Sequence, residues 1–351
     1  MRNIRKMCLA AWLLTAGAAT VCSGEMYYSE EDPVPSSEIE YSGPIYSSMD
    51  EESYAIQIAP AYDTGMAAEY IPEMPEIRAL VDEVYDAEEL TAFGETAPSD
   101  EAFARLAEEI EKLSEGNHHV SLVMADLASQ SGVSYRSTVP MCSQSTIKSV
   151  YIGALLESRP EALDENGQYM HDAIVFSDND AYMTLREIYG SGPILRWCEK
   201  TGVDYGFADM EYPRDHSARD MFKMWTQLYC YLNGGLDSHN FGRYYADSSA
   251  SATKKQLGNR CPVQTKAGWE HGLPEYTNFD PYDEIPERFM DGDPMNNECT
   301  INDTGIVYTD AGPYIFAIYT DHPFGVFKDY TDVNPLYDLV EALYEVQQSF
   351  H

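Results

Sequence analysis

The residues best suited to chemistry in this sequence are Ser145 and Lys148, a serine and a lysine three positions apart. The apolar residues that follow recur at helical spacing, which predicts a helix over 145–157 with both side chains on one face. Ser145 would lie in its first turn, where free backbone N–H groups and the helix dipole favour negative charge. A hydroxyl needs a base to become a nucleophile, and a lysine can be that base when burial or a second cation lowers its pKa. This spacing favours acyl transfer through Ser145.

Two further short motifs follow in order, Ser177-Asp-Asn179 and Lys266-Ala-Gly268. Each motif alone is weak evidence, because Ser-Asp-Asn is common in turns and Lys-Ala-Gly fits many strand ends. Lys266 is a candidate for the second cation that would lower the pKa of a catalytic lysine. Taken together and in this order, the three motifs predict one polar site.

The elements that must position these motifs can be predicted from periodicity and turn residues. Ser99 is a helix N-cap, and Gly116 ends the helix that follows it. The region 160–235 is mostly helical by the same criteria. Alternation and turn signals predict five strands and a last helix: strands 120–126, 133–139, 262–269, 304–309 and 314–320, and helix 334–348. We therefore expect an α/β (α+β) domain, with an antiparallel five-stranded sheet built from both chain ends, flanked by helices and packed beside an all-helical lobe.

The beginning of the sequence has the layout of a secretory signal peptide over residues 1–24: basic residues, an apolar run over 7–21 and small residues. No stop-transfer pattern follows, so no transmembrane span is expected in the mature chain. The predicted location is therefore secreted or in the cell envelope. A lipid anchor at Cys22 is the lesser alternative, because Val21 fits a lipoprotein cleavage site poorly.

Residues 25–98 are acidic and show no sustained periodicity, so this segment is predicted to be largely disordered, with a short helix within 75–95 that either packs on the domain or lies loose. The folded catalytic domain is expected over 99–351. The formal net charge of −37 excludes nucleic-acid binding as a main function.

The cysteines show no CxxC motif and no cysteine–histidine cluster, so neither a metal nor another cofactor is predicted. In an exported protein, disulfides become possible. Cys198 with Cys230 and Cys261 with Cys299 are reasonable pairs that leave Cys142 free, although the sequence alone does not fix the pairing.

The three motifs together resemble the S-x-x-K, S-D-N and K-T-G signature of class A β-lactamases and penicillin-binding proteins. The segment 124–132 is similar to the strand and turn before the active-site helix of that family, and 303–309 with 312–320 resemble its fourth and fifth strands. The resemblance covers roughly residues 100–351 and implies the β-lactamase/transpeptidase-like fold.

This resemblance implies the roles of the residues in acyl transfer. Ser145 would form the acyl-enzyme, Lys148 would accept its proton, and Ser177 would relay that proton to the departing nitrogen. The N–H groups of Ser145 and Trp269 would form the oxyanion hole, where one donor is worth about 3–4 kcal/mol.

The resemblance also implies how substrate is held. Asn179 would bind the side-chain amide of the substrate and Lys148, Lys266 would attract its carboxylate, and Gly268 and Trp269 would complete the binding site. Ala267 departs from the family pattern, because it lacks the usual hydroxyl that helps to bind the carboxylate of a β-lactam.

Two further features bear on turnover. Ser177 follows Ser145 by only 32 residues, which implies a trimmed helical lobe. Class A enzymes activate the deacylating water with a glutamate on a later loop, for which Glu211 is the best candidate here; a solvated loop acid is the alternative interpretation.

The sequence therefore predicts an exported serine hydrolase that acts on β-lactams, with antibiotic resistance as the consequence, or on D-Ala-D-Ala-type peptides. The alternatives are a D,D-carboxypeptidase or transpeptidase of peptidoglycan, and a catalytically weak protein with the same fold that contacts the cell wall.

Overall fold

The computed structural model describes residues 74–84, 89–208, 215–234, 236–270, 300–322 and 334–351, all of which fall in the compact unit Ala55–His351. The predicted signal peptide and most of the acidic segment lie outside the described residues. No helix in the described ranges has the length and apolar character that a membrane crossing needs. Within the same ranges, no group of three or more His, Cys, Asp or Glu side chains could hold a metal ion.

The described unit is built on an antiparallel sheet with the strand order β1-β3-β2-β8-β7-β6. Its strands are β1 (Thr91–Gly94), β2 (Val120–Asp126), β3 (Ser131–Tyr135), β6 (Val263–Glu270), β7 (Thr300–Thr309) and β8 (Gly312–Thr320). The two central strands β2 and β8 come from opposite ends of the domain, as expected. The fold class predicted from the sequence is confirmed, but the sheet has six strands instead of five, because β1 pairs with the edge of β3.

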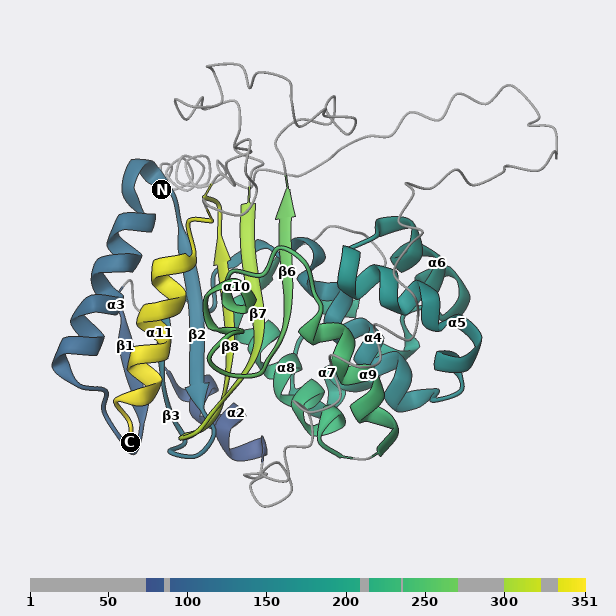
Figure 1. The fold of residues 1–351 in the computed structure, drawn as a ribbon, viewed down its shortest axis with the longest axis horizontal. Helices are drawn as coiled ribbons and strands as arrows, with labels where there is room; N and C mark the ends of the chain where they lie inside the picture. Colours follow the sequence, from purple (N-terminus) through teal and green to yellow (C-terminus); the bar gives the residue numbers. More distant parts are fainter. Residues whose placement is uncertain (1–73, 85–88, 209–214, 235, 271–299, 323–333) are drawn as a thin grey trace, which may run out of the picture. The chain divides into compact units, whose positions relative to one another are not determined.

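The helices of the unit differ in length and lie on both sides of the sheet (Figure 1). They are α2 (Met74–Glu83), α3 (Asp100–Leu113), α4 (Ile147–Ser158), α5 (Ala162–His171), α6 (Asn179–Tyr189), α7 (Gly192–Thr201), α8 (Ala218–Leu232), α9 (Leu236–Ala246), α10 (Ala252–Leu257) and α11 (Tyr337–Gln348). A second, two-stranded sheet pairs β4 (Pro140–Cys142) with β5 (Asp215–Ser217).

One face of the sheet is covered by α3 and α11, which lie side by side in Figure 1, and by α10. The Ser99 side chain caps α3 by accepting from the backbone N–H of Ala102, as its sequence position predicts. Apolar residues of α3, α11 and the strands form one continuous core on this face, which includes the fully buried Leu106 and Leu339.

The other face packs against α8, which contacts β2, β7 and β8. On its other side α8 packs against α4 and α7 of the helical lobe. Trp197 and Trp225 are fully buried in this second core. Because α4 packs against the helices α5, α7 and α8, nearly all its side chains are buried, including Lys148. This burial decides the chemistry of the candidate site.

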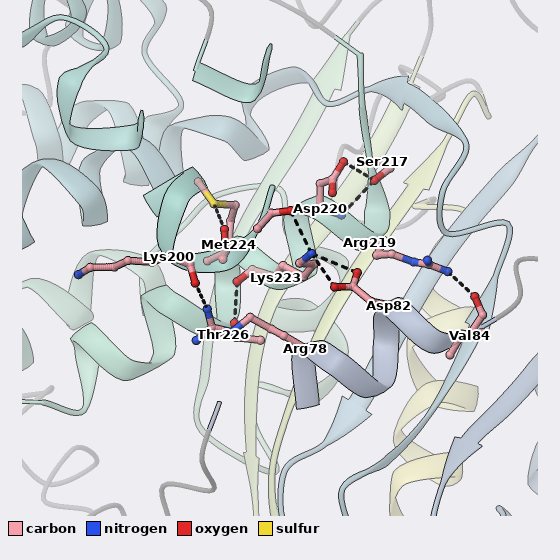
Figure 2. Close-up of polar contacts among 12 residues, drawn as sticks. Arg78, Asp82, Val84, Lys200, Ser217, Arg219, Asp220, Lys223, Met224 and Thr226 are labelled. Carbon is pink, nitrogen blue, oxygen red and sulfur yellow. Dashed lines mark hydrogen bonds and ion pairs between the residues drawn. The ribbon is translucent and has the colours of Figure 1, made fainter. Parts of the chain in front are cut away.

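The helix α2 docks on α8 through polar contacts (Figure 2). The buried Lys223 ammonium pairs with the Asp82 carboxylate at 2.9 Å, and Arg219 donates to the Val84 carbonyl at 2.8 Å. Ile77 and Val81 of α2 are fully buried. The pattern had left open whether the helix within 75–95 packs or lies loose, and the structure shows that it packs. Ahead of the domain limit expected at residue 99, β1 also pairs with β3.

The Lys223–Asp82 pair is expected to stabilise this docking, since its loss leaves a buried ammonium without its carboxylate. Asp82→Ala should lower the free energy of unfolding by about 1–2 kcal/mol, less than for a fully buried pair because the Asp82 side chain is half exposed. Urea unfolding would measure the change, with Glu83→Ala, an exposed acid on the same helix, as the control. Equal stability of both variants would contradict the assignment.

The suggested disulfide between Cys198 and Cys230 is wrong, since both are free thiols on α7 and α8. Burial raises the pKa of Cys198 to about 11, so its thiolate is scarce at neutral pH. Cys261 is also a free thiol, and its suggested partner Cys299 lies outside the described residues. Cys142 is a free thiol, as expected.

Candidate active site

Ser145 lies in a short 3-10 turn, η2 (Gln144–Thr146), that leads directly into α4. The predicted placement in a first helical turn is therefore observed, with regular α-helix beginning at Ile147. Gln144 has a φ of 46°, a left-handed conformation that strains a non-glycine residue and tends to occur at functional sites. Ser145 is 7% exposed, so its hydroxyl lies at the edge of the interior.

The third motif approaches this turn from the edge strand β6. A Cβ atom added to Gly268 would lie 2.9 Å from both the Ser145 nitrogen and the Ser143 carbonyl oxygen. Only glycine allows the strand to come this close without a shift of backbone. The contact brings the backbone of the third motif to the N–H of the proposed nucleophile, which is the neighbourhood an oxyanion hole shared with Trp269 requires.

Lys148 is completely buried on α4. Its Nζ donates to the Ser177 carbonyl oxygen and to Asn179 Oδ1, both at 2.6 Å, and lies 5.8 Å from the centroid of the Tyr182 ring. Burial lowers the pKa of Lys148 to about 7, and the negative charge of Asp178 offsets only part of this effect. An amine with such a pKa is partly neutral at neutral pH and can accept a proton.

Ser177 is held by an unusual backbone. It follows a π-helical turn, η3 (Asp172–Phe176), and has φ 61° and ψ 29°, in the left-handed region. Asp178 then caps α6, because its Oδ1 accepts from the Ala181 N–H at 2.9 Å. A π-turn followed by a left-handed non-glycine residue is typical of functional sites. With this backbone, the Ser177 carbonyl oxygen accepts from Lys148, and the Ser177 hydroxyl contacts a second lysine.

That second lysine is Lys266, which is completely buried on β6. Its Nζ donates to Ser177 Oγ at 2.9 Å and to the Ala267 carbonyl oxygen at 2.7 Å, and lies 5.5 Å from the centroid of the Trp269 ring. Burial holds the pKa of Lys266 well below its usual range, and the positive charge of Lys148 lowers it further. The two lysines thus meet at one serine, and the charge of Lys148 disfavours that of Lys266.

Asp303 is a charged neighbour to which the sequence analysis gave no role. It lies on β7 opposite Ala267, is fully buried, and its Oδ2 accepts from Ser251 Oγ and from the Thr253 N–H, both at 2.9 Å. Burial raises the pKa of Asp303 to about 6 in spite of these hydrogen bonds. Its charge acts against the lowering of the Lys266 pKa. The only signal in the sequence was an acidic residue directly before the predicted strand 304–309.

The structure therefore brings the three motifs to one place, although the catalytic roles of their residues stay predictions. Lys148, Ser177, Asn179 and Lys266 are joined by hydrogen bonds, and Gly268 contacts the turn that carries Ser145. Glu211, the candidate for the deacylating base, lies outside the described residues.

A sequence model described as the beta-lactamase enzyme family matches residues 165–346, more than half of the chain. The chain belongs to the beta-lactamase enzyme family. The resemblance to β-lactamases and penicillin-binding-protein-like serine hydrolases that the motifs predicted is thereby confirmed. The matched range includes Ser177, Asn179 and Lys266, whereas Ser145 and Lys148 precede it, so the structure is what joins the first motif to the other two.

Several solved structures are similar to this member of the beta-lactamase family. A beta-lactamase from Streptosporangium roseum matches with a TM-score of 0.50 and 16% sequence identity, over 70% of this chain and 99% of that chain. A beta-lactamase from Desulfarculus baarsii has a TM-score of 0.49 and 18% identity, over 71% and 96%. A mutant of PBP-A in an acyl-enzyme complex with penicillin G has a TM-score of 0.48 and 15% identity, over 70% and 96%. A comparison with curated protein sequences gives no match.

Proposed function

We propose that this chain is an exported serine hydrolase of the class A β-lactamase type, which forms an acyl-enzyme on Ser145 with β-lactam or related amide substrates. One observation carries the proposal: Lys148 is fully buried, fixed by two oxygen acceptors, and has a pKa of about 7. A buried lysine whose pKa is lowered to near neutrality is a candidate for a functional site, because lysines are seldom fully buried in proteins. The basic and apolar N-terminus of the sequence supports export.

In the proposed acylation, neutral Lys148 takes the proton of Ser145 while Oγ bonds to the substrate carbonyl carbon. The charge that develops on the carbonyl oxygen is stabilised by the N–H groups of Ser145 and Trp269. The C–N bond then breaks as Ser177 gives its hydroxyl proton to the departing nitrogen, and the proton on Lys148 returns to Ser177. The hydrogen bond that Lys266 Nζ donates to Ser177 Oγ supports this step, because Ser177 is the acceptor and its own hydroxyl hydrogen stays available to the substrate.

Substrate binding is proposed to use the other polar groups of the site. Asn179 would orient the side-chain amide of the substrate while it holds Lys148. Lys266, with Gly268 and Trp269 beside it, would bind the substrate carboxylate, whose negative charge would raise the lowered pKa of this lysine. Ala267 provides no hydroxyl for the carboxylate, so Lys266 would carry this interaction alone.

Hydrolysis of the acyl-enzyme, which frees Ser145, is the second half of the proposed reaction. Glu211 would activate the water that hydrolyses the acyl-enzyme. No cofactor takes part in this scheme. Without such a base, the acyl group would persist or pass to an amine, as in a D,D-carboxypeptidase or transpeptidase. The missing hydroxyl at Ala267 favours a third candidate, a catalytically weak protein that contacts the cell wall.

The test is to incubate the mature protein with a chromogenic β-lactam and with a labelled penicillin, and to locate any adduct by peptide mass. Fast turnover supports the β-lactamase, and a stable adduct on Ser145 supports the peptidase-like enzyme. Absence of turnover and adduct, with D-Ala-D-Ala peptides left uncut, would contradict the catalytic proposal.

A second prediction concerns the contact between Gly268 and the nucleophile turn. In Gly268→Ala, the new Cβ meets backbone atoms of Ser143 and Ser145, so the strand or the turn must shift. A shift of this size should slow acylation by labelled penicillin about 10- to 100-fold while the protein stays folded. Gly167→Ala on α5 is the control, because its Cβ would meet only Leu163 at an ordinary 3.5 Å. A wild-type rate in Gly268→Ala would refute the close approach.

A further inference from the structure

Phe176 is a large apolar side chain that is 64% exposed, and it directly precedes Ser177 in the chain. Single exposed apolar residues are normal on protein surfaces, and Ile188 and Tyr205 of the same lobe are examples. Phe176 differs from them in position, because its neighbour Ser177 holds the Lys266 ammonium at 2.9 Å and touches Lys148 through its carbonyl. Phe176 is therefore an exposed aromatic residue bonded directly to a residue of the candidate active site.

The Phe176 ring is supported by a series of aromatic contacts that leads into the interior. It packs edge-to-face on His171, with ring centroids 5.3 Å apart, and His171 packs edge-to-face on Tyr244 at 5.2 Å. Tyr244 in turn packs on Phe241 at 5.3 Å, and Phe241 is 1% exposed. Such edge-to-face contacts are favourable beyond the area they bury. An exposed ring that rests on the core in this way is held in place.

The backbone around Phe176 is fixed as well. Phe176 is the last residue of the π-helical turn η3, and the left-handed Ser177 follows it. The Val175 carbonyl accepts from the Ser249 N–H at 2.9 Å, and His171 Nδ1 lies 2.9 Å from Asp172 Oδ1. A side chain that is ordered before binding loses little entropy when a ligand covers it.

We propose that Phe176 is a specificity-determining residue that binds an apolar, preferably aromatic, side group of the substrate. This inference rests on the proposed acylation at Ser145. An exposed ring gains most from a group that removes it from water and that can pack against its face or edge. The neighbouring Ser177, Asn179 and Lys266 would hold the polar parts of the same molecule.

The test compares two probes with the full mature chain: penicillin G, which carries a phenylacetyl side group, and the penicillin nucleus without a side group. Phe176→Ala should lower the second-order rate constant of acylation by penicillin G about 10-fold, through weaker binding. Acylation by the bare nucleus should change less than about 2-fold. Phe176→Tyr, which keeps the ring, should restore the preference for penicillin G, and Ile188→Ala is the control for removing an exposed apolar side chain of the lobe.

An equal loss of acylation rate with both probes would overturn the inference, because Phe176 would then act only by positioning Ser177. Unchanged acylation rates on both probes would also overturn the inference. This is the result expected if the Phe176 ring bound a protein partner instead of the substrate. A wild-type chain that reacts with neither probe would refute the proposed function and this inference with it. A wild-type chain that reacts, with a variant that shows no difference between probes, would refute the role of Phe176 alone.

Discussion

Ser145→Ala is expected to slow the acylation of the protein by labelled penicillin by at least about 10⁴-fold, because the substitution removes the proposed nucleophile. The rest of the site should remain, since Lys148, Ser177 and Lys266 hold one another without the Ser145 hydroxyl. Gel fluorescence after a fixed time and stopped-flow rates would measure the loss. The melting temperature should stay the same or rise, as strained sites often cost stability.

A matched control for this variant is Ser158→Ala. It removes a hydroxyl from the same helix, where Ser158 Oγ donates to the Ala154 carbonyl at 2.9 Å, away from the three motifs. This control should acylate at the wild-type rate. If Ser145→Ala kept more than about a tenth of the wild-type rate, the assignment of Ser145 as nucleophile would be wrong.

Substitution of Lys148 is expected to have the second largest effect on the acylation rate, and to change how this rate depends on pH. Lys148 must be neutral to accept a proton, and its pKa is about 7, so the acylation rate of the wild type should rise with pH through about 7 and then level off. Lys148→Arg keeps a cation that does not lose its proton, and should lower the rate about 10³- to 10⁴-fold at every pH. Stopped-flow acylation between acidic and mildly alkaline pH would measure both.

Lys254→Met is the matched control for this experiment. Burial also lowers the pKa of Lys254, which lies on α10 outside the hydrogen-bonded site, so its loss tests whether any buried lysine gives the pH dependence. We expect Lys254→Met to keep the wild-type profile. A wild-type rate that fell as the pH rose through 7 would exclude Lys148 as the base.

The same lysine has a consequence for stability. The unfolded chain keeps a lysine pKa near 10.5, whereas the folded value is about 7, so between these values the unfolded state binds the extra proton. Lys148 therefore makes the free energy of unfolding increase as the pH rises from about 7 to 10.5, and it destabilises the fold most at lower pH. Lys148→Met should remove this slope and stabilise the inactive protein at neutral pH.

The parts of the fold that follow from local sequence were predictable. The Ser99 cap, the strand at 120–126 and the helix after Ser145 depend on nearby residues, and the structure has each of them at or close to the expected positions. The order of the three motifs also predicted that Ser177 and Lys266 would meet, and they do. Each of these features needs only a period, a cap or a known combination of short motifs.

The parts that depend on distant contacts were not predictable in this way. The four residues of β1 are a strand only because Thr91 pairs with Ser134, far along the chain. The left-handed backbone of Gln144 and Ser177 is imposed by packing, since neither residue type favours it. The proximity of two cysteines cannot be read from their spacing, which is why Cys198 and Cys230 were paired wrongly.

The strand β1 has a consequence for the behaviour of shortened forms of this protein. It covers the outer edge of β3 over the four pairs from Thr91↔Ser134 to Gly94↔Ser131. A chain cut to begin at residue 99 would leave that edge with free N–H and C=O groups, which another copy of the chain could pair with. Besides its part in the sheet, the short strand β1 would therefore prevent two copies of the chain from pairing through the edge of β3.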